Sequence, residues 1–544
     1  MDENEISIIS SKDFPKVAEV LQNFVNKNEN KFDFPYLSEN NMRISIWAAL
    51  FEHLQDKSAE SIHTLCLATV RVLSRDKTEM ENLICERWMI TLIEKAGLYN
   101  FIDPSEDITE NIIPCKEVAV EALKCLCNVS FNSEVARALC AHTSIAQGLV
   151  ARLRSYKEIP YKDDIMIFDM KVLFILTALR QDIRAKIKNE LHGMDYLISC
   201  LGELVSESLK VDEASGGLQQ IILTDDQVAI ACEILKTQFN LMYHSGPEEP
   251  LTAEEEATCL KLMPVLTSLL MAETHSWDKL MDLHSNIANL LTSVPPEFYE
   301  YLTPKCNDGE PVRHFYDGRN MEAIHGLLQL MQHRLTISTT TRGIIENLSP
   351  ILTVLIKSAR SVRAQRKYLR LTVLPPLRDV SRPPEKGTTL RNQLCRLLTT
   401  PVTSVRDLVA EFLFILCKEK VGRMVKYTGF GNAAGHLAQK GLMSGGRGIV
   451  RYSSSSEDSD TEEYLEAQPN IDPVVGCTRP PRANPFENMT EEQKEHEAMK
   501  LVNLFDKMVS QGVVKPATIG PDGKPKPVEH VLEMRENPPN RPQS

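Results

Sequence analysis

The sequence predicts an all-α protein, an armadillo/HEAT-type right-handed α-solenoid followed by a disordered C-terminal tail that carries one amphipathic helix. Apolar residues make up 42% of the 544 residues, but only 6% are aromatic, and long runs of Leu, Ile, Val, Ala and Met show little strand-like alternation. Between residues 10 and 440, amphipathic segments of about ten to twenty residues follow one another with short polar breaks. The alternative to the solenoid is a large irregular helical domain.

Two sequence patterns recur in this region and indicate repeats. In the first, an apolar helix ends at a small polar residue and a new helix opens near an Arg, as at 126–137 (LCNVSFNSEVAR), 176–184 (LTALRQDIR) and 356–363 (IKSARSVR). In the second, the pattern E-x-L-K-x-x-x-N appears at 121–129 (EALKCLCNV) and 233–241 (EILKTQFNL). Degenerate helical repeats of about 45 to 60 residues are typical of armadillo and HEAT arrays, because each helix pair leaves an apolar face open until the next repeat covers it.

The composition changes near Gly441 to low complexity, acidic residues and proline. We therefore expect a superhelical body at 1–444, an acidic, phosphorylatable linker at 445–489, an amphipathic helix at 490–512 and a disordered tail at 513–544.

Charge, cysteine usage and hydropathy restrict the class of protein. The net charge of −13 argues against a nucleic-acid partner, which usually requires a basic excess. The 13 cysteines are scattered, residues 1–10 lack the features of a signal peptide, and no window of 18 apolar residues occurs. The sequence therefore predicts a cytoplasmic protein without an integral membrane segment.

No motif indicates catalysis, a metal or another cofactor. Cys125 and Cys127 lie two residues apart, so on a helix they point in different directions and cannot hold one ion together. The glycine-rich stretch 429–435 (GFGNAAG) follows a predicted helix rather than a strand, which predicts an interhelix turn instead of a nucleotide-binding loop. We expect a protein that is not an enzyme.

Four asparagines lie where a purely structural helix would favour Leu or Ala, namely Asn128, Asn240, Asn286 and Asn289. In an α-solenoid, amides on the inner helices can hydrogen-bond the backbone of a bound peptide. Alternatively, they cap or bridge neighbouring repeats. Arg71 and Arg75 lie four residues apart on a predicted helix, where they either grip a carboxylate together or form a solvated edge.

The end of the body is strongly basic, with 21 Lys or Arg against 6 Asp or Glu between residues 334 and 451. The acidic, serine-rich stretch 453–466 follows it directly. Ser454, Ser455 and Ser459 each have an acidic residue three positions later, which is the pattern of a casein kinase 2 type kinase. Phosphates on this stretch would dock on the basic residues of the body. An RNA or lipid surface and a merely solvated face are the alternatives.

One segment of the tail has the pattern of an amphipathic helix. Thr490 and Gln493 fit a capping box, and Gly512 is placed to end the helix. Its apolar stripe consists of Ala498, Leu501, Val502, Phe505, Met508 and Val509. A lone helix with such a stripe is expected to dock in a groove, on its own body or on a partner.

Specific phrases along nearly the whole chain resemble the synembryn family, also called the resistance to inhibitors of cholinesterase family. These phrases are 70–77 (VRVLSRDK), 121–128 (EALKCLCN), 283–289 (LHSNIAN), 320–325 (NMEAIH), 373–380 (VLPPLRDV), 410–419 (AEFLFILCKE), 426–435 (KYTGFGNAAG), 460–464 (DTEEY) and 469–473 (PNIDP). The resemblance implies a cytosolic armadillo/HEAT-type exchange factor and folding chaperone for heterotrimeric G-protein α subunits. A concave groove would capture the C-terminal helix of the GDP-bound α subunit and stabilise the nucleotide-free state.

The resemblance also implies roles for particular residues. Arg71 and Arg75 would anchor the terminal carboxylate of the α subunit, and Asn128 would be a groove contact. Phe239, Asn240, Asn286 and Asn289 follow by their position on the inner helices. Phosphates on Ser454 and Ser459 would bind Arg360, Arg363 and Lys367, and the tail helix, with Leu501, Val502 and Phe505, would reach the nucleotide-side switch region. We expect a monomer that is recruited to the cell cortex; a passive helical-repeat scaffold at the cortex is the alternative.

Overall fold

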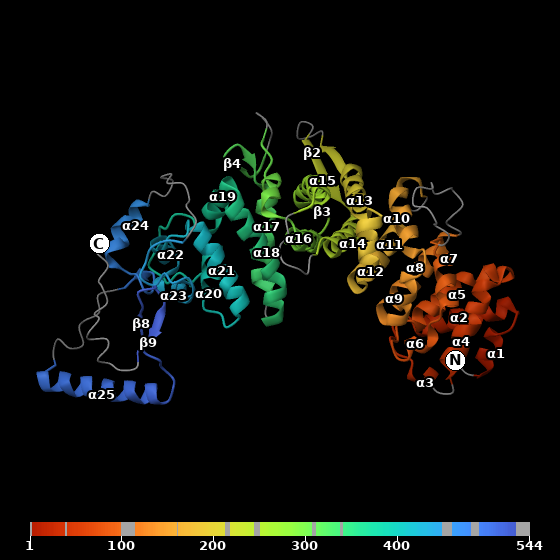
Figure 1. Cartoon of the computed structure of the whole chain (residues 1–544), viewed down its shortest axis with the longest axis horizontal. Coiled ribbons are helices and arrows are strands. Elements are labelled where there is room, and N and C mark those ends of the chain that lie inside the picture. Colours follow the sequence, from red (N-terminus) through yellow and green to blue (C-terminus); the bar gives the residue numbers. More distant parts are fainter. Residues whose placement is uncertain are drawn as a thin grey trace. The chain divides into compact units, whose positions relative to one another are not determined.

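The computed structural model describes residues 3–38, 41–98, 115–159, 162–212, 218–243, 251–306, 312–337, 341–448, 460–479 and 489–528 (Figure 1). The chain divides into two compact units, Met1–Phe298 (unit 1) and Tyr299–Ser544 (unit 2). Each unit is built mainly from helices.

Unit 1 is a succession of helices with one small sheet. Its helices are α1 (Glu3–Ile9), α2 (Phe14–Lys27), α3 (Pro35–Ser38), α4 (Met42–Gln55), η2 (Lys57–Ile62), α5 (His63–Leu73), α6 (Met80–Leu83), α7 (Glu86–Lys95), α8 (Lys116–Asn132), α9 (Glu134–Ala141), α10 (Ile145–Arg154), η3 (Tyr156–Glu158), α11 (Lys162–Leu179), α12 (Gln181–Ala185), η4 (Lys186–Glu190), α13 (Gly193–Glu207), α14 (Asp225–Met242), α15 (Ala253–Leu270) and α16 (Trp277–Leu291). The strands β1 (Leu209–Asp212) and β2 (Leu218–Leu223) pair antiparallel, and β2 pairs with the short β3 (Glu273–Thr274) in parallel.

Five helices of unit 1 pack on one another in sequence order: α5 on α8, α8 on α11, α11 on α14, and α14 on α16. We call them the stacked helices. Each buries apolar side chains between its neighbours, such as Leu67 of α5, Leu126 of α8 and Leu173 of α11. The predicted all-α solenoid of stacked repeats is thereby confirmed within unit 1.

The first sequence pattern is explained by an arginine that caps the preceding helix. Arg137 Nη1 donates to the carbonyl oxygens of Ser130 and Phe131, and Arg184 donates to those of Thr177 and Ala178. The last carbonyl groups of a helix lack partners within the helix, so a cation there satisfies them and the helix dipole.

The third instance of this pattern also lies where one helix ends and the next begins. Helix α18 runs to Ser361, and α19 begins at Arg363. Here Arg366 Nη1 donates to Ala359 O near the end of α18, at 2.9 Å.

A buried ion pair joins α10 to the stacked helix α11. Arg152 Nη2 of α10 donates to Asp169 Oδ1 of α11 at 3.0 Å, and the Tyr156 hydroxyl donates to Asp169 Oδ2 at 2.8 Å. Arg152 also donates to Ala96 O at 2.9 Å. Burial raises the pKa of the Asp169 carboxyl to about 6, although Arg152 and Tyr156 oppose that shift.

The boundary between the units falls within η6 (Pro296–Leu302). Unit 2 contains α17 (Glu322–Ile337), α18 (Thr341–Ser361), α19 (Arg363–Val373), α20 (Leu390–Leu397), α21 (Thr403–Leu416), α22 (Val421–Thr428), α23 (Phe430–Gln439), α24 (Glu462–Ala467), η7 (Gln468–Asn470) and α25 (Glu491–Ser510). Its strands form three antiparallel pairs: β4 (Phe315–Tyr316) with β5 (Arg319–Asn320), β6 (Ile471–Asp472) with β7 (Cys477–Thr478), and β8 (Ala517–Ile519) with β9 (Pro525–Pro527). Helix α18 packs on α17, α19 and α21.

Part of the predicted linker is structured, which corrects the expectation of an acidic linker over 445–489. Residues 460–479, which we call the strap, contain α24, η7, β6 and β7, and the side chains of Tyr464 and Cys477 are buried. The body also continues to Gly448, whose N–H donates to Glu419 O at 2.7 Å. The strap is ordered because a few of its groups, including Tyr464, have buried positions on the body, which average composition does not reveal.

The strap explains the glycine-rich stretch 429–435. The N–H groups of Phe430 and Gly431, at the start of α23, donate to the carbonyl oxygens of Pro473 and Val474 at 2.8 and 2.9 Å. Gly429 has a φ of 75°, and a Cβ there would lie 2.9 Å from Val475 O. The prediction of an interhelix turn is thus confirmed only at Gly429, between α22 and α23, because residues 430–435 belong to α23, whose start is capped by the strap.

The end of the tail is also partly structured. The hairpin β8–β9 lies within 513–544, which we predicted to be disordered, and Met443 N donates to Gly523 O at 3.2 Å. Within the described ranges, none of the helices combines the length and the apolar composition that crossing a membrane requires.

Candidate protein-binding face on the stacked helices

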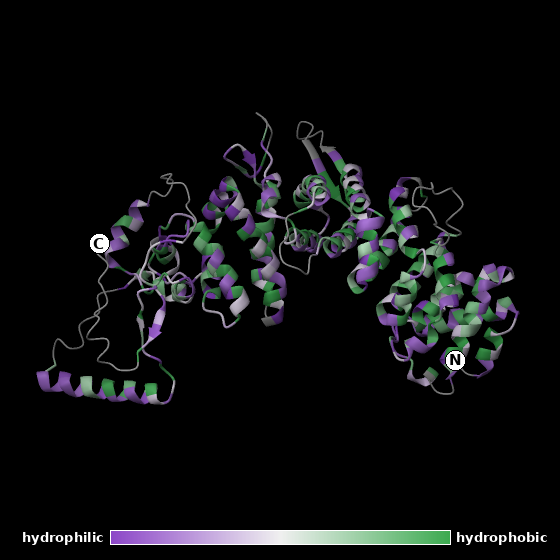
Figure 2. Cartoon of the chain, in the orientation of Figure 1, coloured by the Kyte–Doolittle hydropathy of each residue, from purple (hydrophilic) through white to green (hydrophobic). Residues whose placement is uncertain are grey.

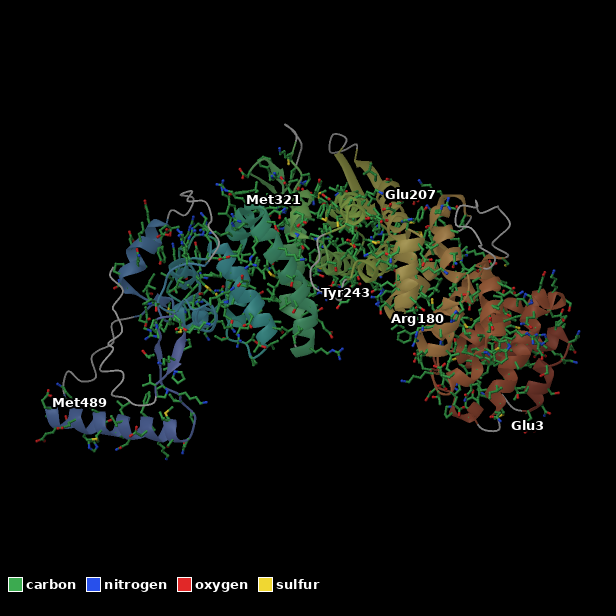
Figure 3. All side chains as sticks on the ribbon, viewed as in Figure 1. Glu3, Arg180, Glu207, Tyr243, Met321 and Met489 are labelled. Atoms are coloured by element: carbon green, nitrogen blue, oxygen red, sulfur yellow. The ribbon has the colours of Figure 1, made fainter. Side chains whose placement is uncertain are left out.

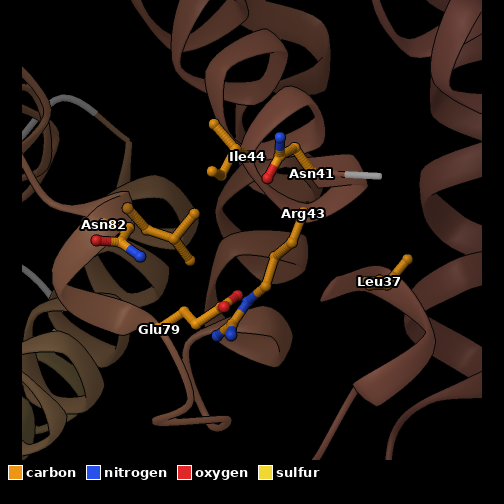
Figure 4. A pocket seen from close by; sticks show the side chains of 7 residues that line it. Leu37, Asn41, Arg43, Ile44, Glu79 and Asn82 are labelled. Atoms are coloured by element: carbon orange, nitrogen blue, oxygen red, sulfur yellow. The ribbon is translucent and has the colours of Figure 1, made fainter. Parts of the chain in front are cut away.

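The end of α5 is fixed by a buried arginine of α4. Arg43 Nη2 donates to Leu73 O at 2.9 Å and to Asp76 O at 2.5 Å. Figure 4 shows Arg43 extending into a small pocket beside Glu79, so this pocket is occupied by the chain's own side chains. Although burial opposes it, hydrogen bonds from Thr78 and Phe34 lower the pKa of Asp76. The turn after α5 is therefore held in one position.

Arg71 and Arg75 do not lie on one helix as predicted. Helix α5 ends at Leu73, and the Ser74 side chain donates to Arg71 O, so Arg75 lies in the following turn. Arg71 Nε donates to Glu121 Oε2 of α8 at 2.7 Å. Arg75 Nη1 donates to Glu29 O at 2.5 Å, and its guanidinium lies 5.5 Å from the centre of the Phe32 ring. Both guanidinium groups thus have partners within the chain, although each keeps further N–H groups.

Asn128 and Asn240 bridge neighbouring helices, which was the structural alternative. Asn128 Nδ2 donates to Arg71 O and Ser74 Oγ of the preceding repeat, at 3.0 and 3.1 Å. Asn240 Nδ2 donates to Phe174 O and Thr177 Oγ1, at 3.3 and 3.1 Å. The two asparagines of the second sequence pattern therefore make the same contact, to a carbonyl and to a hydroxyl three residues later.

The other predicted asparagines lie on α16. Asn286 Nδ2 donates to Asp282 O of its own helix at 2.9 Å. Asn289 lies half-buried near the end of α16. The surroundings of Asn286 and Asn289 do not by themselves indicate a binding partner.

The most exposed apolar side chains near these asparagines lie at the ends of successive stacked helices. Phe131 near the end of α8 is 67% exposed, Leu179 at the end of α11 is 49% exposed, and Tyr243 after α14 is 53% exposed. Figure 3 labels Tyr243 and also Arg180, the residue that follows Leu179. The half-buried Phe239 ring lies 6.0 Å from that of Tyr243. Exposed aromatic and aliphatic side chains at corresponding places on successive helices are typical of protein-binding surfaces.

Sequence reasoning missed Phe131 and Tyr243. Their signal was present in the second pattern, because each aromatic residue follows the bridging asparagine by three positions. On a helix, that spacing places the two side chains on the same face. We call Arg71, Arg75, Phe131, Leu179, Phe239 and Tyr243 the candidate face.

Of the two cysteines of α8, Cys125 is buried in the core and Cys127 is half-buried. Cys125 Sγ donates to Leu67 O at 3.1 Å, and burial raises the pKa of the Cys127 thiol to about 12. Among the described residues there is no group of His, Cys, Asp or Glu that could hold a metal ion.

The predicted phosphate-docking residues lie on α18 and α19 of unit 2. Arg360 Nη2 pairs with Glu411 Oε1, Arg363 is exposed, and Lys367 is half-buried. Ser454 and Ser459 lie outside the described residues, so the docking of their phosphates stays a prediction. Asp460, the first described residue after Ser454 and Ser459, pairs with Lys426, which is not one of the predicted docking residues.

The predicted tail helix is confirmed as α25. Thr490 and Gln493 form a capping box with both hydrogen bonds present, and Gly512 has a φ of 70°. No residue of α25 is buried, and Leu501, Val502 and Phe505 are exposed. Figure 2 shows that the first half of α25 is hydrophilic and that the hydrophobic residues lie in the second half.

The stacked helices define the chain as a helical-repeat protein, and exposed aromatic and cationic side chains on such helices are typical of protein-binding surfaces. A family model described as "Guanine nucleotide exchange factor synembryn" matches residues 66–524. The chain is 40% identical to "Chaperone Ric-8A" of Gallus gallus over 532 residues, covering 97% of this chain and 96% of that protein. It is 35% identical to "Chaperone Ric-8" of Drosophila melanogaster over 583 residues, covering 99% of each. The chain therefore belongs to the synembryn family of guanine nucleotide exchange factors.

A comparison with solved structures finds a crystal structure of SYS-1, with a TM-score of 0.40 and 15% identity over 76% of this chain and 63% of that one. That likeness is too low to carry an argument about this protein.

Proposed function

We propose that this protein is a receptor-independent guanine nucleotide exchange factor and folding chaperone for heterotrimeric G-protein α subunits. The observation that carries the proposal is the match to the synembryn family, which covers residues 66–524 and extends over nearly the whole length of two curated relatives. The exposed row of Phe131, Leu179 and Tyr243 on the stacked helices supports binding of an apolar helix there.

The partner in this proposal is the C-terminal helix of a GDP-bound or nascent α subunit. Its apolar side would lie on the candidate face, and its terminal carboxylate would accept hydrogen bonds from the remaining N–H groups of Arg71 and Arg75. Withdrawing that helix from the α subunit removes supporting contacts of GDP, so GDP leaves. The exchange factor needs no acid, base, metal or cofactor of its own, because it acts by binding the nucleotide-free state more tightly than the GDP-bound state.

Two elements of unit 2 would assist. The exposed side of α25, with Leu501, Val502 and Phe505, is proposed to contact the switch region of the α subunit. Phosphates on Ser454 and Ser459, added by a casein kinase 2 type kinase, are proposed to bind Arg360, Arg363 and Lys367. We further propose a cytoplasmic monomer that is recruited to the cell cortex.

The experiment that tests the proposal is the rate of GDP release from purified inhibitory-class and q-class α subunits, with and without the full chain. We expect faster release and a nucleotide-free complex that GTP dissolves. Phe131→Asp should reduce the acceleration by about tenfold or more, since a charge then lies where an apolar side chain binds. The matched control is Phe315→Asp, at a 61% exposed aromatic residue of unit 2. Tight binding without acceleration for either α subunit would favour the passive scaffold.

A second pair of variants tests the carboxylate anchor. Arg75→Glu should weaken binding of the α subunit, whereas Arg87→Glu, at an exposed arginine of α7, should not. Arg75 is the better choice than Arg71, because a glutamate at 71 would face Glu121 and disturb the packing of α5 on α8. If both variants bind the α subunit with the same affinity, Arg75 does not bind its terminal carboxylate.

A further inference from the structure

One aromatic ring on the stacked helices lies close to two ammonium groups. Lys124 Nζ of α8 and Lys171 Nζ of α11 lie 5.2 and 4.9 Å from the centre of the Phe168 ring. All three side chains are half-buried. A cation near an aromatic face is stabilised by the ring, but the ring carries no net charge that could neutralise it.

The carboxylates at this place do not balance the cations. Glu121 Oε1 pairs with Lys124 Nζ at 2.8 Å, and Glu121 Oε2 pairs with Arg71 Nε at 2.7 Å. One carboxylate thus serves two cations. Lys171 has no ion pair with any acidic side chain in the described part of the chain. Arg71, Lys124 and Lys171 are therefore three cations against the one carboxylate of Glu121, in a chain whose net charge is −13.

The next pair of stacked helices has the same arrangement without the excess. Lys236 Nζ of α14 lies 4.7 Å from the centre of the Phe174 ring of α11. Lys236 also pairs with Glu233 at 2.8 Å, so one cation there faces one carboxylate. The pair of Lys236 and Glu233 is thus neutral, and the difference between the two places comes mainly from Lys171.

A half-buried ammonium group without a counter-ion is costly, because it has lost part of its hydration and has gained no charge partner. A carboxylate that arrives with a binding partner supplies a charge-assisted hydrogen bond there and little further desolvation. The position fits such a role, because Phe168 and Lys171 belong to α11, between the helices that carry Phe131 and Tyr243.

We propose that Lys171, together with Lys124, forms a carboxylate-binding subsite that accepts an Asp or Glu side chain of the bound α-subunit helix. The inference rests on the proposed function. It states which kind of side chain the candidate face recognises, namely an acidic one. This contact is separate from the binding of the terminal carboxylate by Arg71 and Arg75. The subsite also sets the direction of the bound helix, since its acidic residue must lie over α8 and α11 rather than over α14.

The test is the affinity of the full chain for a purified GDP-bound inhibitory-class α subunit, measured by biolayer interferometry at low and moderate salt. Lys171→Met keeps the length of the side chain and removes its charge, and we expect it to weaken binding about tenfold at low salt. Lys171→Arg keeps the charge and should stay within about threefold of the wild type. The matched control, Lys236→Met, removes a lysine that already has its own carboxylate and should change the affinity less than twofold.

The partner group is then identified by a double-mutant cycle. Each Asp and Glu of the C-terminal helix of the α subunit is changed to Asn or Gln, and we expect one of these changes to weaken wild-type binding but to have little further effect on Lys171→Met. Two results would overturn the subsite: a folded Lys171→Met variant that binds as tightly as the wild type, or equal losses of affinity for Lys171→Met and Lys236→Met. The proposed function would still stand in either case, provided that the wild-type chain accelerates GDP release. If the wild-type chain binds no α subunit at all, both the subsite and the proposed function are wrong.

Discussion

The junction of α5, α8 and α11 and the junction of α11 and α14 are built from the same sequence pattern but differ in charge. In both, an asparagine donates to a carbonyl and a hydroxyl of the preceding helix, and a lysine three residues after a glutamate pairs with it. Among the described residues, the glutamate of the first junction also pairs with an arginine, and a second lysine lies at the ring there. The second junction has one glutamate–lysine pair and one lysine at its ring within the same part of the chain. The shared residues hold the repeats together, whereas the residues that differ are available to select a partner.

The largest expected effect concerns the core beneath the first junction. Arg152→Leu leaves the buried carboxylate of Asp169 without its counter-ion, so we expect a loss of about 3–5 kcal/mol in the free energy of unfolding at pH 7.5, measured by urea denaturation. The folded-state pKa of Asp169 is already raised to about 6 and rises further in the variant. Stability that depends on a raised carboxyl pKa is lost as the pH rises through that pKa, so the loss should be smaller at pH 5.5.

The control for this variant lies two residues further along α10. Arg154→Leu removes an exposed arginine whose guanidinium lies 5.8 Å from the centre of the Tyr196 ring, and it should cost no more than about 1 kcal/mol. Equal losses from the two variants, or a loss from Arg152→Leu that does not depend on pH, would contradict the role of the buried pair.

The next effect tests whether the two junctions share one scaffold. Asn128→Ala and Asn240→Ala each remove two hydrogen bonds between helices, and each should lower the free energy of unfolding by about 1–3 kcal/mol. Asn26→Ala removes an exposed hydrogen bond within its own helix, from Gln22 Nε2 of α2, and should change stability by less than about 0.5 kcal/mol. If only one of the bridging asparagines mattered, the two junctions would not be equivalent.

The smallest expected effect makes the second junction resemble the first. Glu233→Gln leaves Lys236 without its carboxylate, so we expect affinity for the α subunit to rise a few-fold at low salt and the gain to vanish at high salt. The exposed pair Lys494–Glu491 on α25 offers a control, because Glu491→Gln leaves the stacked helices unchanged. If Glu233→Gln instead lowers the affinity for the α subunit, Glu233 does not act by neutralising Lys236 at the second junction.

The sequence predicted the helical class, the tail helix with its cap at Thr490 and the interhelix turn at Gly429, because local chemistry decides each of these. It also identified the pattern that contains Asn128 and Asn240. It left open whether these amides bridge repeats or bind a peptide, because the carbonyl and hydroxyl groups that they bind lie more than fifty residues away in the chain.

The placement of Arg71 and Arg75 on one helix was wrong because the length of α5 depends on Arg43, a residue of another helix that binds the carbonyl groups at its end. The strap was missed for a related reason. Its composition is that of a linker, but Pro473 and Val474 cap α23, and composition does not record a long-range contact of that kind.

The measurement that tests the central claim most directly is site-specific photocrosslinking in the complex with a GDP-bound α subunit. A photoreactive phenylalanine analogue at Phe131 places the probe on the candidate face, and the same analogue at Phe315 is the control at a similarly exposed residue. We expect crosslinks from position 131 to the C-terminal helix of the α subunit and none from position 315. Crosslinks from 315 alone, or from 131 to another part of the α subunit, would contradict the account.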